Sequence, residues 1–162
     1  MSRFRPPVRA KGDGFVVDLG TDESDLIRRL IGELRSMLTD PSPDAAVETL
    51  LARLFPPAHH DDEEMEAEYQ RLMREELVQS KLSAFDIVDE TLAGKGLIDE
   101  ARLLAVMQSI NSIRLVLGTM LGVTDDPEAD EVTAGLENSS EYHLYSYLSW
   151  LLEWCVRALG AG

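Results

Sequence analysis

Cysteine is nearly absent from this sequence, because Cys155 is the only one among 162 residues. A single cysteine excludes a disulfide within the chain, and low cysteine usage is typical of proteins in reducing compartments. We therefore expect a cytoplasmic protein. A redox role for Cys155 would need a partner thiol from another molecule.

Long uninterrupted apolar runs are also missing. Residues 1–14, MSRFRPPVRAKGDG, carry charges without the apolar run of a signal peptide, so we expect none. The longest mostly apolar stretch, residues 103–123, is interrupted by Gln108, Asn111 and Arg114. A membrane span would have to bury Arg114 at a cost, so this stretch predicts a core helix and no membrane association.

The short motifs of common catalytic and nucleotide-binding sites are absent as well. No G-x-x-x-x-G-K-[ST], G-x-G-x-x-G or G-x-S-x-G pattern occurs. Carboxylates are abundant throughout, but abundance alone does not define a catalytic constellation. We therefore expect a protein that is not an enzyme, with no catalytic residue and no cofactor.

Positive charge is scarce. The chain has 15 Lys and Arg against 30 Asp and Glu, a net charge of −15. Residues 1–20 hold four basic and two acidic residues, a net of +2, so the rest of the chain carries −17. This acidic body repels phosphate backbones and anionic lipids, and no recognition-helix pattern accompanies Arg28 and Arg29. The charge argues against direct nucleic-acid binding and makes a basic surface the natural partner.

Helical periodicity is what the sequence has in abundance. A composition of 44% hydrophobic and 28% charged residues fits one globular domain over residues 1–162. Residues 1–20 predict a β-hairpin arm, because β-branched residues flank a glycine-containing turn at residues 11–14. Residues 21–162 predict a helical body. The expected fold class is mainly α, a bundle of about five to six helices with a short N-terminal β-hairpin.

The helix boundaries follow from apolar spacing and from capping residues. In the region from Asp61 to Leu92 the apolar stripe drifts in phase around residues 79–81, which predicts a kink or a break there. The other expected helices are one ending at Asp40-Pro41, one opened by Ser42-Pro43 and stopped by Pro56-Pro57, one over residues 100–121 capped by Asp99, one over residues 126–135 and one opened by Asn138.

Half of the aromatic residues lie in one segment of thirteen residues, Tyr142, Tyr145, Tyr147, Trp150 and Trp154. On a helix, four side chains lie within about 60° of one another. We call them the aromatic edge: His143, Tyr147, Trp150 and Trp154. The aromatic edge adjoins an apolar band that runs from Leu144 to Leu159. Together the two are wider than one core stripe needs, so we expect the band to face the core and the edge to cover the hairpin or to meet a second molecule.

Two constellations suggest site chemistry that the spacing does not support. Cys155 and His143 lie about 18 Å apart along one helix, so they cannot form a nucleophile and base pair within one subunit. The apolar band also favours a buried, inert thiol with a raised pKa. His59 and His60 precede a run of carboxylates and could hold zinc or manganese, but adjacent histidines point apart and no second ligand set occurs. We expect a solvated, acidic helix start and no metal.

Polar residues within the apolar helix leave two interpretations open. Gln108, Asn111 and Arg114 need partners if they are buried. One interpretation is an internal polar network that fixes the helix register, with Asp86, Asp89 or Glu90 facing Arg114. The alternative is a small-molecule-binding or catalytic domain with a polar pocket around Arg114.

Three segments carry a family resemblance. They are Leu51–Ala58 leading into Asp61, Asp62, Glu68 and Tyr69, then Ile110–Gly118 continued through Thr119–Asp125, and then Tyr142–Leu159. With the apolar stripe at residues 26–38, they resemble an actinobacterial family of unknown function that is commonly encoded beside the ClpS adaptor.

The resemblance implies a transcriptional regulator linked to oxidative stress that acts through a cysteine pair and a sigma-factor partner. This chain has only one cysteine, Cys155. For this chain the resemblance therefore implies a protein-binding role and not a thiol switch within one subunit. We therefore expect a non-enzymatic regulatory protein whose partner is a sigma factor or another transcription component. A homodimer formed through the aromatic edge is the alternative.

Overall fold

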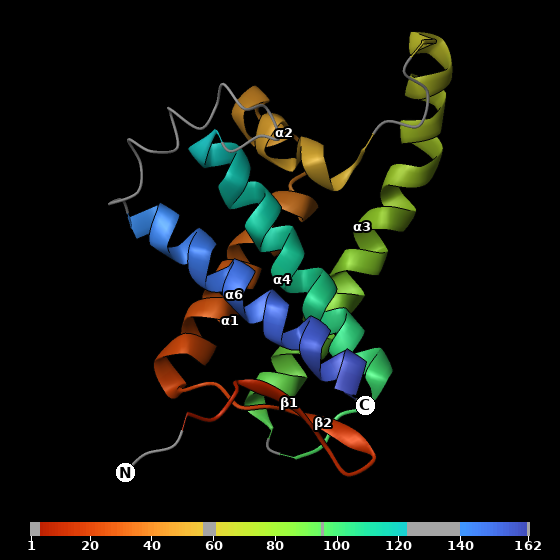
Figure 1. Cartoon of the computed structure of the whole chain (residues 1–162). Helices are drawn as coiled ribbons and strands as arrows, with labels where there is room; N and C mark the ends of the chain where they lie inside the picture. The colour runs from red at the N-terminus through yellow and green to blue at the C-terminus, as the bar shows by residue number, and fades with distance from the viewer. Residues whose placement is uncertain (1–3, 57–60, 95, 123–139, 162) are drawn as a thin grey trace.

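The computed structural model describes residues 4–56, 61–94, 96–122 and 140–161, and is mainly α, as the sequence predicts (Figure 1). In these ranges a two-stranded hairpin precedes five α-helices. The helix predicted over residues 126–135, and Asn138, which was predicted to open the last helix, lie outside the described residues. The elements are β1 (Val8–Lys11), β2 (Gly14–Val17), α1 (Thr21–Thr39), α2 (Ala45–Leu51) with a 3-10 turn (Ala52–Leu54), α3 (Glu63–Ala93), α4 (Glu100–Leu121) and α6 (Ser140–Ala161).

Aspartate side chains cap the N-termini of three of the helices. The Asp99 carboxylate accepts a hydrogen bond from the backbone N–H of Arg102 at 2.9 Å, which confirms the predicted cap of α4. Asp62 caps α3 in the same way. The predicted cap of α2 at Ser42 is wrong. Asp44 takes that place, and its carboxylate accepts from the N–H of Val47 at 2.9 Å.

Helix α3 runs for 31 residues without a break, so of the kink or break predicted at residues 79–81 the break is wrong. Its buried residues are confined to the second half, at Ala84, Phe85 and Val88. The N-terminal half extends beyond the other helices (Figure 1). The change in apolar phase therefore marks the point where one continuous helix leaves the core. Since the first half of α3 has no buried face, its apolar residues need not stay in phase with those of the second half.

Helix α4 is the core helix that the sequence predicts. Among the residues that the structure describes, it alone is long and apolar enough to cross a membrane, but 56% of that apolar window is buried inside the fold. Its most extensive contacts are with α3 and α6. The apolar side chains of α4 are therefore satisfied by neighbouring helices, as in a core helix.

The hairpin packs on α6 and on the link between α3 and α4. Strands β1 and β2 pair antiparallel, with Val8 opposite Val17. Phe15 and Ile98 exchange two backbone hydrogen bonds, each of 2.9 Å, and both side chains are buried. A two-stranded hairpin is marginal alone, so these contacts with the helices stabilise it.

The close approach at Gly14 yields a first testable prediction. A Cβ at this position would lie 2.7 Å from the backbone oxygen of Ile98, closer than real Cβ contacts. Gly14→Ala should therefore lower the free energy of unfolding by about 1–3 kcal/mol, measured by urea denaturation. Gly32→Ala is the matched control, because a Cβ there meets nothing within 4 Å and alanine favours the interior of α1. We expect that control to be stabilised by about 0.5–1 kcal/mol, and equal losses in both variants would contradict the packing described here.

Candidate functional site

Helix α6 places Tyr147, Trp150 and Trp154 as one continuous row of rings. The ring centroids of Tyr147 and Trp150 lie 5.9 Å apart, and those of Trp150 and Trp154 lie 6.4 Å apart at an interplanar angle of 82°. Both separations lie in the range of favourable aromatic contacts, and the Trp150–Trp154 pair is edge-to-face, so the rings hold one another in place. Trp150, in the middle of the row, keeps 41% of its surface exposed. His143, at the start of the aromatic edge, is exposed as well.

The N-terminal arm and α6 itself cover one end of the aromatic edge. The ring of Phe4 lies 5.7 Å from that of Trp154, and the guanidinium of Arg157 lies 5.0 Å over the same indole. Trp154 is half-buried and also packs against the core. Burial, together with the carboxylate of Glu23, also raises the pKa of Tyr147. Within the aromatic edge, Trp154 therefore contacts the arm, whereas Trp150 is exposed to solvent.

Cys155 faces the core, as the apolar band predicts. Its side chain has no exposed surface, and burial raises the pKa of the thiol to about 12, an effect that a weaker backbone hydrogen bond only partly offsets. The thiolate is the reactive form of cysteine, so this environment disfavours reaction of Cys155 with oxidants and metals in the folded chain. His59 and His60 lie outside the described residues. Within the described part, no group of three His, Cys, Asp or Glu side chains is placed to hold a metal ion.

Arg114 lies on the face of α4 that meets α6. Its Nε and Nη2 donate to Oδ1 of Asn111 at 3.3 and 2.9 Å, and its guanidinium lies 5.8 Å over the ring of Tyr145. Arg114, Asn111, Gln108 and Ser149 line an open groove of about 480 Å³ between α4 and α6. The arginine is half-buried in this groove and lies neither in a dry core nor in an enclosed cavity.

The acidic partners predicted for Arg114 are wrong. Asp86 and Asp89 instead accept from Nη2 of Arg35 at 3.0 and 3.1 Å, and these bonds join α3 to α1. Glu90 lies 3.7 Å from Arg102 at the start of α4. The error is one of helix orientation, because the acidic side of α3 faces α1 and the first turn of α4, whereas Arg114 faces α6.

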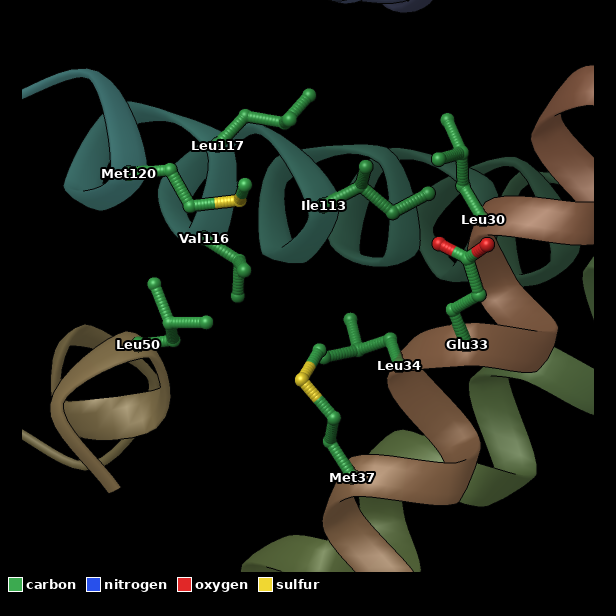
Figure 2. Close-up of a pocket in the computed structure, with 9 residues that line it drawn as sticks. All are labelled: Leu30, Glu33, Leu34, Met37, Leu50, Ile113, Val116, Leu117 and Met120. Carbon is green, nitrogen blue, oxygen red and sulfur yellow. The ribbon is translucent and has the colours of Figure 1, made fainter. Parts of the chain in front are cut away.

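The structure also contains an apolar pocket that the sequence did not reveal. It has a volume of about 350 Å³ and lies among α1, α2 and α4 (Figure 2). No local pattern signals it, since its lining residues other than Glu33 come from the apolar positions of three separate helices, and each position is typical of an ordinary core. Its lining consists of Leu30, Glu33, Leu34, Met37, Leu50, Ile113, Val116, Leu117 and Met120.

Residues 1–159 match the family described as a domain of unknown function, DUF2017. The chain belongs to this family. The match includes the hairpin and extends into the last turn of α6, so the packing of these elements lies within this DUF2017 domain. It confirms the resemblance to an uncharacterised family, and the family description carries no activity.

One curated relative of this DUF2017 chain is a Mycobacterium leprae (strain TN) protein named "Putative oxidative stress regulator AosR". The two are 26% identical over 186 aligned positions, which cover 94% of this chain and 85% of the relative. The likeness therefore spans nearly the whole of both chains. No solved structure matches.

Proposed function

We propose that the protein is a non-enzymatic, cytoplasmic regulator that acts by binding another protein through the aromatic edge of α6. Trp150 is the observation that carries the proposal. It is a large aromatic side chain held by two ring neighbours and left exposed on a regular helix. Such rigid aromatic side chains are enriched among the residues that dominate binding energy at protein interfaces. The name of the mycobacterial relative supports a role in regulation during oxidative stress.

Charge supports a basic partner. The net charge of −15 attracts a basic surface and speeds its encounter with the chain. The finer proposal is that the partner is a sigma factor or another transcription component. In this proposal the protein contributes a docking surface, and the buried Cys155 contributes packing rather than thiol chemistry.

Affinity capture from the source cell tests this proposal. The full chain should retain a stoichiometric protein partner, and Trp150→Ala should lose it without a change in circular dichroism. Val156→Ala is the matched control, because Val156 is 57% exposed on the same helix but lies about 120° around it from Trp150. Recovery of no partner, under both native and oxidising conditions, would refute the proposal.

A homodimer through the same edge is the competing outcome. Light scattering at micromolar concentration distinguishes the two, because a monomer leaves Trp150 available and a dimer occupies it. If the chain is dimeric and Trp150→Ala makes it monomeric, the aromatic edge serves self-association.

A further inference from the structure

The apolar pocket among α1, α2 and α4 has a buried floor and a more open rim. Leu34, Ile113 and Leu117 are buried and form the floor between α1 and α4. Met37 and Met120 contribute flexible thioether side chains, which adapt to ligands of different shape. Side chains from three helices line the pocket (Figure 2). Its volume of about 350 Å³ lies in the range of small-molecule binding sites.

Among the residues that the structure describes, Glu33 is the one charged residue that lines this pocket. Figure 2 shows its carboxylate directed toward α4, between Leu30 and Ile113. Within the described part of the chain, the carboxylate of Glu33 forms no hydrogen bond or ion pair, whereas the guanidinium of the nearby Arg35 is held by two aspartates of α3. An apolar lining with one uncompensated carboxylate is complementary to an apolar molecule that bears one positive charge.

The surrounding charge disfavours an anionic occupant. The side chains of Arg53 and Tyr145 lie beside Gly118 on α4, and Arg53 does not line the pocket. A fatty acid or another apolar carboxylate would therefore meet Glu33 on a strongly acidic protein, and no cation among the described lining residues would offset the repulsion.

We infer that this pocket binds a small apolar molecule that carries a single amino group, with the alkyl part between α1 and α4 and the ammonium group at Glu33. The inference goes beyond the proposed function and is independent of it. The pocket is lined by α1, α2 and α4, whereas the proposed docking surface lies on α6, so either can fail without the other.

Three probes of equal chain length test the inference: n-octylamine, octan-1-ol and octanoate. Titrations of the full chain would be followed by methyl NMR. Shifts are expected at Leu34, Ile113, Leu117 and Met120, and not at the remote core residue Leu151. Octylamine should bind about threefold more tightly than octanol and about tenfold more tightly than octanoate, in keeping with one solvent-accessible ion pair.

Glu33→Gln should bring the affinities for octylamine and octanol within about twofold of each other. Glu33 is exposed, so this substitution should leave the fold intact. Glu64→Gln, an exposed carboxylate in the first turn of α3, is the matched control and should leave the ranking unchanged. Equal binding of octanoate and octylamine, an unaltered ranking in Glu33→Gln, or no shifts at the lining methyl groups would overturn the inference.

Discussion

The thiol of Cys155 should react with iodoacetamide at pH 8 about a thousandfold more slowly in the folded protein than in the chain unfolded in guanidinium chloride. Burial raises the pKa of this thiol from 9.0 to about 12. The fraction of reactive thiolate falls about tenfold for each unit by which the pH lies below the pKa. The side chain has no exposed surface, which slows the reaction further. Mass spectrometry of the alkylated chain over time measures both rates, and similar rates would show that Cys155 is accessible in the native state.

The same pKa makes stability depend on alkaline pH. Between pH 9 and pH 12 the unfolded chain loses the thiol proton while the folded chain keeps it, so the thiol favours unfolding as the pH rises. Its contribution should fall by about 1.4 kcal/mol per pH unit in this window and be constant below it. The difference in unfolding free energy between the wild type and Cys155→Ala isolates this contribution from other groups that titrate in the same range. A difference that does not vary from pH 8 to pH 11 would contradict the raised pKa.

Phe85→Ala should lower the free energy of unfolding by about 3–5 kcal/mol, measured by urea denaturation. Phe85 is among the largest fully buried side chains, and α3 contributes few other residues to the core. Truncation leaves a cavity beside the central helices, which the fixed packing of α1, α3 and α4 cannot close.

Leu72→Ala provides the matched control for Phe85→Ala on the same helix. Leu72 lies on the projecting half of α3 and is 61% exposed, so its truncation should change stability by about 0.5 kcal/mol or less. Comparable losses in the two variants would mean that the N-terminal half of α3 is buried in solution.

The sequence predicts local structure well because local chemistry sets it. The cap at Asp99, the hairpin around Gly12 and Gly14 and the core helix over residues 100–121 each depend on neighbours within a few positions. Two nearby residues, Ser42 and Asp44, could both cap α2. Asp44 is the cap because its carboxylate accepts the hydrogen bond from the backbone N–H of Val47, three residues further on. The break that was one of the two outcomes predicted for α3 does not occur, because a change of apolar phase ends burial without ending a helix.

The site was harder to predict because helix orientation sets it. Periodicity placed Trp150 and Trp154 on one face, but only the fold shows that Phe4 covers one of them and leaves the other open. The partners of Arg114 and the pocket at Glu33 depend on how helices distant in sequence face each other. No alternation along one segment encodes such contacts.

The affinity of the captured partner for Trp150→Ala tests the central claim most directly. Isothermal titration calorimetry should show that this variant binds the partner about thirtyfold more weakly than the wild type, as expected for a central aromatic residue of an interface. Val156→Ala should stay within about twofold. Equal affinities for wild type and Trp150→Ala would contradict the assignment of the aromatic edge as the docking surface.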